Sequence, residues 1–210
     1  MKPLQNIQAN RENSLLLVID IENDFCRPGG MMFKEEKSEE VAGLISTTRR
    51  VIDEARAVGV PIIYVQSVRN HREPEFTVFE HYRLLKFGTW FSQFVDELTP
   101  EPGDLVVRKW CHDPWYGTDL ERVVQGLVPD PTKCQALITG GAMMGCAFFG
   151  ATGFYIRNYR TVLVLDAGYG NPMQAGEHFS RSLYPTFPNI TLTRSDLIQF
   201  SKVEEPVAAG

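Results

Sequence analysis

An apolar segment that ends in two glycines and is followed by a cysteine constrains the fold of this chain more than any other stretch. Residues 136–139 form an apolar run typical of a buried strand, and Gly140-Gly141 interrupts it. A helical pattern then runs from Cys146 to about Asn158, and another apolar run, Thr161–Asp166, follows it. Strand, tight turn, helix and strand in this order predict a βαβ unit with two parallel strands.

Cys146 stands where the helix of this unit begins. Unpaired backbone N–H groups and the positive end of the helix dipole both favour a thiolate at such a position. We therefore expect Cys146 to be a nucleophile. The alternative is an apolar thiol that is simply packed in the core.

The same alternation of strands and helices continues along the rest of the chain. Apolar runs predict six strands, and helical spacing with terminal signals predicts helices between them. Such alternation is typical of one α/β domain with a three-layer, open, mostly parallel six-stranded sheet of order 3-2-1-4-5-6 and helices on both faces. We expect a single domain over residues 1–210, with a core at about 14–200 and polar tails. The expected strands are 15–19, 61–66, 104–109, 134–139, 161–166 and 189–193; the expected helices are 38–58, 90–98, 118–127 (with Thr118 as N-cap), 146–158, 175–183 and 195–200.

Composition excludes several classes of protein. The net charge of the 210 residues is −5 and the basic residues do not cluster, so we expect no nucleic-acid partner and no polybasic membrane contact. No apolar run reaches the roughly 18 residues of a membrane span, and the N-terminal segment Met1–Ser14 is polar. The four cysteines are dispersed, which predicts free thiols in a reducing, cytoplasmic setting. Gly168-Tyr169-Gly170 is too short a motif to indicate a nucleotide site, and we expect no cofactor.

Three residues with complementary chemistry are expected at one edge of the sheet. Parallel sheets bind ligands beyond the carboxyl ends of their strands, where the strand order reverses. Asp20 ends the first strand, Lys109 ends the third and Cys146 follows the fourth. Asp20 could accept the thiol proton, Lys109 could supply positive charge, and the N–H groups of the turn Gly141–Cys146 could hold an oxyanion. The alternative for Asp20 is a strand-end carboxylate that is hydrogen-bonded to loop amides, and the alternative for Lys109 is a surface lysine.

Four motifs resemble those of the isochorismatase-like cysteine hydrolases. They occur in the family's order and span about Ser14 to Phe200. The segments are Ile19-Asp20-Ile21-Glu22-Asn23-Asp24-Phe25, Lys109 with Trp115-Tyr116-Gly117-Thr118-Asp119-Leu120, Gly140-Gly141-Ala142-Met143-Met144-Gly145-Cys146, and Asp166-Ala167.

The resemblance implies a particular site and reaction class. It implies the sheet order given above, an Asp20–Lys109–Cys146 triad, an oxyanion hole from the N–H groups of Ala142 and Cys146, and a cis peptide bond between Gly141 and Ala142. Members hydrolyse C–N bonds of small amides and ureides through an acyl-enzyme, whereas isochorismatases cleave a vinyl ether on the same fold.

The chain departs from the family pattern at three places. Glu22 replaces the usual Gln, and Met143-Met144 replaces Thr-Asp. The segment Ser67–Arg72 lacks the Asp and His cluster of metal-dependent nicotinamidases, and His71, His81, His112 and His178 are scattered. We therefore expect a metal-independent enzyme.

Aromatic and basic residues outside the triad are candidate substrate contacts. We assign Phe25, Arg69, Trp115 and Tyr116 to substrate binding, in part because the irregular segment Arg69–Phe87 is rich in charge and aromatics. Core packing of Trp115 and Tyr116, and a surface position for Arg69, are the alternatives. The apolar residues that surround the helix after Cys146 favour its burial, either in the core or at a subunit contact. Because Gly150 and Gly153 permit close approach, we expect a homo-oligomer, a dimer or tetramer.

Three functional hypotheses follow. The first is a metal-independent cysteine hydrolase that cleaves a C–N bond of a small N-carbamoyl, biuret-like, ureidoacrylate-like or maleamate-like substrate. The second is a vinyl-ether hydrolase of the isochorismatase type, in which Asp20 supplies acid chemistry. The third is a non-catalytic small-molecule-binding protein on the same scaffold.

Overall fold

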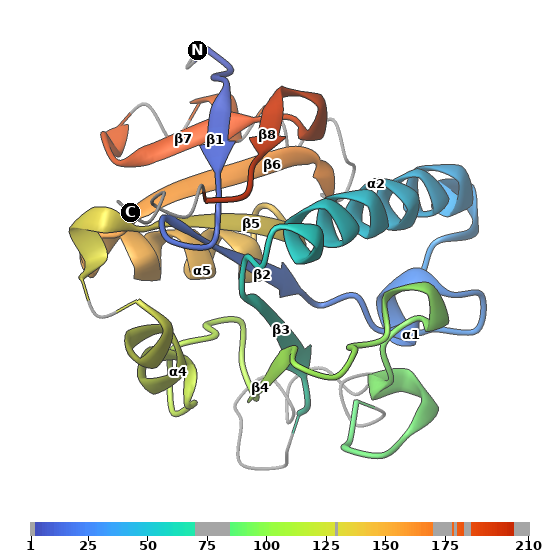
Figure 1. Ribbon diagram of the computed structural model, residues 1–210. Helices are drawn as coiled ribbons and strands as arrows, with labels where there is room; N and C mark the ends of the chain where they lie inside the picture. Colours follow the sequence, from blue (N-terminus) through green and yellow to red (C-terminus); the bar gives the residue numbers. More distant parts are fainter. Residues whose placement is uncertain are drawn as a thin grey trace, which may run out of the picture.

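A parallel sheet of six strands forms the centre of the molecule (Figure 1). The computed structural model describes residues 3–69, 85–128, 130–169, 178, 180–182 and 186–203. The strands lie in the order β4-β3-β2-β5-β6-β7 and every neighbouring pair is parallel. This is the predicted order, so the predicted sheet is confirmed. The strand bounds are β2 Ser14–Ile19, β3 Ile62–Ser67, β4 Leu105–Lys109, β5 Gln135–Gly141, β6 Arg160–Tyr169 and β7 Ile190–Thr193.

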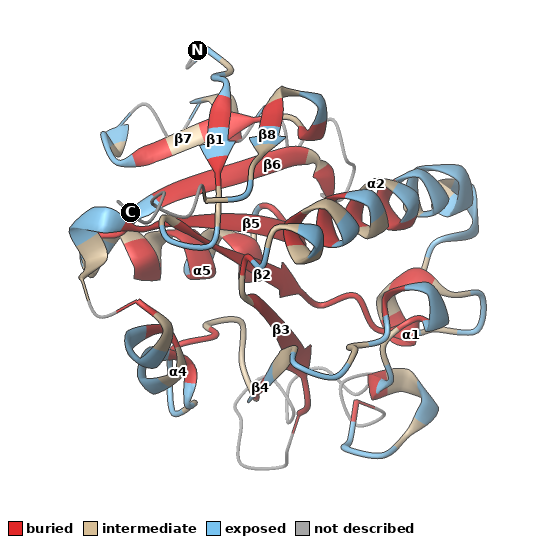
Figure 2. Cartoon of the chain, viewed as in Figure 1, coloured by how far each residue is buried: buried red, intermediate tan, exposed pale blue. Residues whose placement is uncertain are grey.

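Helices cover both faces of the sheet. Along β2, Leu15, Leu17 and Ile19 belong to one buried cluster, which includes residues of α4 (Leu120–Leu127) and α5 (Cys146–Ile156). Leu16 and Val18 point to the opposite face, into a cluster with residues of α2 (Ser38–Ala57). Because side chains alternate along a strand, a sheet covered on both sides needs such continuous apolar strands. Figure 2 shows β2, β3 and β5 buried along their length.

The structure of the segment after residue 194 differs from the prediction. Ser195–Leu197 forms a 3-10 turn, η7, and Ile198–Phe200 forms the short strand β8 instead of the expected helix. β8 pairs in parallel with β1 (Ile7–Ala9), a strand that the sequence analysis missed. The alternation of Ile198, Gln199 and Phe200 suits a strand with one buried side. The pairing joins the two ends of the chain, which no local pattern indicates.

The segment Trp90–Leu98 also differs from the single helix that we expected. It forms two 3-10 turns, η3 (Trp90–Ser92) and η4 (Asp96–Leu98), with an extended link between them. The link pairs with the chain after β2: the N–H of Asn23 donates to Gln93 O at 2.8 Å, and the N–H of Val95 donates to Ile21 O at 3.1 Å. These bonds replace those of a continuous helix and fix the loop that follows Asp20.

Smaller differences concern helix ends. α4 begins at Leu120 with Asp119 as its N-cap residue, although the Thr118 hydroxyl accepts the Leu120 N–H at 3.1 Å. A short helix, α1 (Asn23–Cys26), follows β2 and was not predicted. Most of the helix expected over 175–183 and most of the irregular segment 69–87 lie outside the described residues, although residues 178 and 180–182 are described and are helical. None of the helices in the described ranges combines the length and apolar character needed to cross a bilayer.

Candidate active site

The three residues singled out in the sequence meet at the carboxyl edge of the sheet. Lys109 Nζ lies 3.0 Å from Asp20 Oδ2 and 3.2 Å from Cys146 Sγ. All three side chains are buried, with Lys109 fully inaccessible to solvent. β4 is not adjacent to β2, because β3 lies between them. The long lysine side chain bridges this distance and passes the end of β3, where its Nζ lies 3.4 Å from Ser67 Oγ.

The Gly140-Gly141 pair explains how β5 comes close enough to β2. Gly140 has a φ of 85°, and a Cβ on it would lie 2.0 Å from the carbonyl oxygen of Ile19. A Cβ on Gly141 would lie 2.6 Å from the ring of Tyr169. Only glycine fits at both positions. The peptide bond between Gly141 and Ala142 is cis, as the resemblance implied.

The turn between β5 and Cys146 is closed by backbone hydrogen bonds. The Ala142 carbonyl accepts the N–H groups of Gly145 and Ala147 at 2.9 and 3.1 Å, which closes the turn. The N–H of Met143 donates to Tyr169 O at 2.7 Å. Within the described residues, the N–H groups of Ala142, Met144 and Cys146 have no backbone acceptor. Of these three residues, Ala142 and Cys146 line the cavity described below, so a ligand oxygen there could use their N–H groups.

Burial determines the protonation of Cys146. It raises the pKa of the Cys146 thiol to about 12, and the charge of Asp20 adds to this effect. The ammonium of Lys109 lowers the pKa but does not compensate. Desolvation thus outweighs the helix terminus, which by itself would favour the thiolate. A base must remove the proton when the sulfur reacts.

Lys109 is held in its charged form. Burial alone would lower the pKa of its ammonium, but the nearby Asp20 and Cys146 outweigh burial and raise the pKa above its ordinary value. The buried group thus contains one ammonium with two acidic neighbours. Such a cluster is electrically balanced when the two acids together carry one negative charge.

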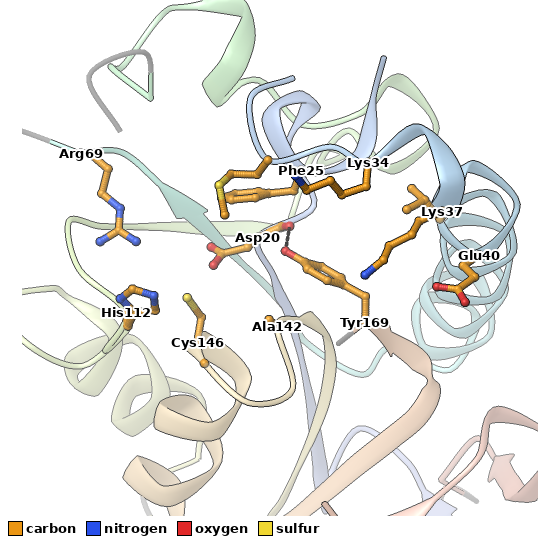
Figure 3. A pocket seen from close by; sticks show the side chains of 13 residues that line it. Asp20, Phe25, Lys34, Lys37, Glu40, Arg69, His112, Ala142, Cys146 and Tyr169 are labelled. Atoms are coloured by element: carbon orange, nitrogen blue, oxygen red, sulfur yellow. Dashed lines mark hydrogen bonds between the residues drawn. The ribbon is translucent and has the colours of Figure 1, made fainter. Parts of the chain in front are cut away.

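A cavity opens above this group (Figure 3). It holds about 850 Å³ of empty space, including its open mouth. In Figure 3, Asp20 and Cys146 project toward the same space, with Arg69 and His112 on one side and Tyr169 on the other. The Tyr169 hydroxyl donates to the Asp20 carbonyl at 3.1 Å. The lining residues are Asp20, Phe25, Met32, Lys34, Lys37, Glu40, Val41, Arg69, His112, Ala142, Gly145, Cys146 and Tyr169.

Two of the four expected substrate contacts line this cavity, and sequence reasoning missed others. Phe25 and Arg69 are part of the wall, and the buried Arg69 donates from Nη1 to Trp110 O at 2.7 Å. Lys34, Lys37 and Tyr169 were not predicted. The lysines stand in a polar stretch without a motif, although their position soon after Asp20 was a usable signal.

Trp115 and Tyr116 require a correction, because neither lines the cavity. Trp115 is a core residue: its Nε1 donates to Gly150 O at 3.2 Å, and its ring packs on Phe154 with centroids 4.7 Å apart. It lies so close to α5 that a Cβ on Gly153 would be 1.9 Å from Nε1. Tyr116 is 68% exposed on the outer surface.

The part of the chain that the structure describes contains no group of three or more His, Cys, Asp or Glu side chains suited to a metal ion. Of the four histidines, His112 lines the cavity. His71 and His81 lie outside the described residues.

The family assignment rests on the match to a known domain. A model of the isochorismatase domain matches residues 14–194. The chain belongs to the isochorismatase family. Its Asp20, Lys109 and Cys146 all lie within the matched range, as do the motifs that carried the resemblance.

One relative of the chain is an amidohydrolase. The chain is 28% identical over 145 residues to the ureidoacrylate amidohydrolase RutB of Methylobacterium radiotolerans, which covers 57% of this chain and 54% of that protein. This isochorismatase-family chain thus spans about half the length of that relative.

Solved structures share the fold. The N-carbamoylsarcosine amidase of Thermoplasma acidophilum aligns over 92% of this chain and 99% of its own, with a TM-score of 0.73 and 24% identity. A cysteine hydrolase from Pseudomonas syringae pv. phaseolicola aligns over 93% and 94%, with a TM-score of 0.77 and 17% identity. At these identities, the similarity shows the isochorismatase-like fold.

Proposed function

We propose that this protein is a metal-independent cysteine hydrolase that cleaves a C–N bond of a small amide or ureide through an acyl-Cys146 intermediate. The observation that carries the proposal is the contact of Lys109 Nζ with both Asp20 and Cys146 at the floor of an open cavity. The names of the amidohydrolase relatives support the same bond type.

The first half of the reaction forms the acyl-enzyme. Asp20 takes the proton from the Cys146 thiol as Sγ attacks the substrate carbonyl carbon. The carbonyl oxygen becomes an oxyanion that accepts hydrogen bonds from the N–H groups of Ala142 and Cys146. One such donor contributes roughly 3 kcal/mol in the transition state. Asp20 then gives its proton to the leaving nitrogen as the C–N bond breaks.

The second half releases the product. A water attacks the thioester carbon while Asp20 accepts its proton, and the tetrahedral intermediate expels the Cys146 sulfur. The proton on Asp20 returns to that sulfur, which restores the starting state. Through both halves Lys109 stays charged, while one negative charge moves between the Asp20 carboxylate, the substrate oxyanion and, as it is expelled, the Cys146 sulfur.

The cavity wall supports a substrate that carries an anionic group. Lys34, Lys37 and Arg69 contribute positive charge to the lining. The acidic residues of the lining are Glu40 and, at the floor, Asp20. Phe25 and Val41 add apolar surface. A small amide or ureide with a carboxylate fits this wall. Ureidoacrylate and N-carbamoylsarcosine, after which two similar proteins are named, are carboxylates of that kind.

Ammonia release from a panel of amides and ureides tests the proposal. Ureidoacrylate, N-carbamoyl amino acids, maleamate, biuret and nicotinamide cover the main alternatives. We expect turnover of at least one carboxylate-bearing member, and its loss in Cys146→Ala. Ammonia release that persists in Cys146→Ala would contradict the covalent route, whereas turnover of isochorismate and of no amide or ureide would favour the vinyl-ether hydrolase. The absence of turnover across the panel and with isochorismate would favour a binding protein.

We further propose that the protein works as a homo-oligomer in a reducing, cytoplasmic setting. Phe149 and Ile156 on α5 are 42% and 70% exposed, next to the exposed Tyr116. An exposed apolar group of this kind is typical of a subunit contact. All four cysteines are free. Light scattering should show a dimer or tetramer for the wild type and a lower mass for Ile156→Asp. A monomeric wild type would contradict the oligomer.

A further inference from the structure

Glu22 is a buried acid that the mechanism above does not use. It lies two residues after Asp20 and has no exposed surface. Its Oε1 accepts the N–H of Ser67 at 2.6 Å, at the end of β3. Its Oε2 is buried, and no described residue gives it a hydrogen bond. The family pattern has Gln here, which would present one acceptor and one donor in the same shape.

The surroundings of Glu22 contain more acid than base. Asp20 is on the same segment, and its Oδ1 is also buried without a partner among the described residues. The thiol of Cys26 on α1 and the phenol of Tyr169 on β6 also lie within electrostatic range, and burial raises the pKa of both. Phe94, which forms an antiparallel bridge with Glu22, brings backbone groups to this site and no charge.

Lys109 is the cation that acts on Glu22, and it is already engaged. Its Nζ contacts Asp20 Oδ2, Cys146 Sγ, Ser67 Oγ and the Cys111 carbonyl, at 3.0 to 3.4 Å. An ionised Glu22 would be a second buried carboxylate on a single ammonium, which is costly. Burial, followed by the charge of Asp20, raises the pKa of Glu22 well above its ordinary value, and the Ser67 N–H and Lys109 oppose this only in part.

We propose that Glu22 is a positioning residue that works as a neutral carboxylic acid, and that its ionisation disables the neighbouring triad. In the neutral form Oε1 is the acceptor for Ser67 and Oε2 carries the proton. Ionisation breaks the Oε2–H bond, releases the proton to solvent, and adds a negative charge beside Asp20 and Lys109. That charge makes loss of the Cys146 proton less favourable, because it competes for the positive charge of Lys109.

The first test measures stability, and it does not depend on the proposed function. A buried acid with a raised folded-state pKa gives its full contribution to stability below the pKa of the unfolded chain, about 4.5 for Glu. The contribution is lost progressively as the pH rises above that value, because the unfolded chain releases the proton first. Glu22→Gln does not titrate. Its urea midpoint relative to wild type should therefore rise steadily from pH 5 to pH 9.

The control is Glu12→Gln, which removes an exposed carboxylate at the opposite edge of the sheet. Its urea midpoint should follow that of the wild type at every pH. Parallel curves for Glu22→Gln and wild type would overturn the proposal, since they would mean that Glu22 binds no extra proton in the folded state. Infrared spectra give a second readout: the C=O stretch of a protonated acid should be present in wild type and absent in Glu22→Gln.

The second test measures the effect on the triad and rests on the proposed function. With a substrate found in the panel, the alkaline limb of kcat/KM should lie about one pH unit or more higher in Glu22→Gln than in wild type. Glu22→Leu, which cannot accept from Ser67, should lose turnover that Glu22→Gln retains. Coincident alkaline limbs would overturn the link between Glu22 and the triad. Failure of the whole panel would instead count against hydrolysis and leave the stability result standing.

Discussion

Strand β5 has a cysteine near each of its ends, and the two thiols differ in what surrounds them. Cys134 directly precedes the strand and Cys146 follows the turn after it. Both are buried, and burial raises the pKa of each to about 12. Cys146 contacts Lys109 and has Asp20 in reach. Cys134 donates to the carbonyl of Gln135 at 3.5 Å.

Nearby positive charge alone does not distinguish the surroundings of Cys146 from those of Cys134. Cys134 also lines a hollow, which contains the basic residues Lys133 and Arg160, but no carboxylate is present among its described lining residues. The difference is therefore the proton acceptor. A buried thiol with a high pKa becomes a nucleophile when a carboxylate can take its proton during attack, and a cation can balance the exchange.

The largest expected effect separates the two cysteines directly. Cys146→Ser should lower kcat/KM by roughly 10⁴-fold or more, because the attacking sulfur is lost. Cys134→Ser should keep wild-type turnover and lose about 1–3 kcal/mol of stability, because its hydroxyl is buried with one weak acceptor. Ammonia release and urea unfolding of both variants give the comparison. Equal losses of turnover would remove the distinction between the two ends.

The next effect concerns the charge balance at the Cys146 end. Lys109→Met leaves the buried Asp20 without its cation. The free energy of unfolding should fall by about 3–5 kcal/mol, and turnover should be lost. The matched control is Lys109→Met with Asp20→Asn, which removes both charges and should recover much of the stability but none of the activity. A single variant as stable as wild type in urea would contradict a buried ion pair.

A smaller effect is expected at the cavity wall. Lys34→Ala with Lys37→Ala should raise KM for a carboxylate substrate roughly tenfold, with kcat changed much less, because the lost contacts are distant from the reacting atoms. A neutral amide substrate should respond little. Lys202→Ala, which removes an exposed lysine outside the lining, is the control. Equal effects on neutral and anionic substrates would contradict recognition of an anionic group.

The sheet order and the meeting of Asp20, Lys109 and Cys146 could be predicted from the sequence for a physical reason. Continuous apolar strands alternating with helices allow few topologies, and the strand order fixes which strand ends meet. Asp20, Lys109 and Cys146 stand at three such ends, so their proximity did not require any knowledge of side-chain conformation. The β1–β8 pair was missed because it depends on a contact between the two chain ends.

Other features depend on what covers a residue, which local sequence does not reveal. A tryptophan such as Trp115 is equally expected in a core and in a pocket from the sequence alone. Its close contact with Gly153 on α5 places it in the core. Burial of the Cys146 side chain raises its pKa, and this effect outweighs the place of Cys146 at a helix start. Lys34 and Lys37 stand at the two ends of the 3-10 turn η1 (Glu35–Lys37), in a polar stretch without a motif; their place soon after Asp20 was a signal, but the folded cavity identifies them.

The account requires a covalent bond between substrate and one particular sulfur. The most direct measurement is mass spectrometry of the protein quenched in acid during turnover of a panel substrate, followed by peptide mapping. We predict an added acyl mass on the peptide that contains Cys146, removable by hydroxylamine, and none on the peptide that contains Cys134. Steady turnover with no adduct on Cys146, or an adduct on another residue, would contradict it.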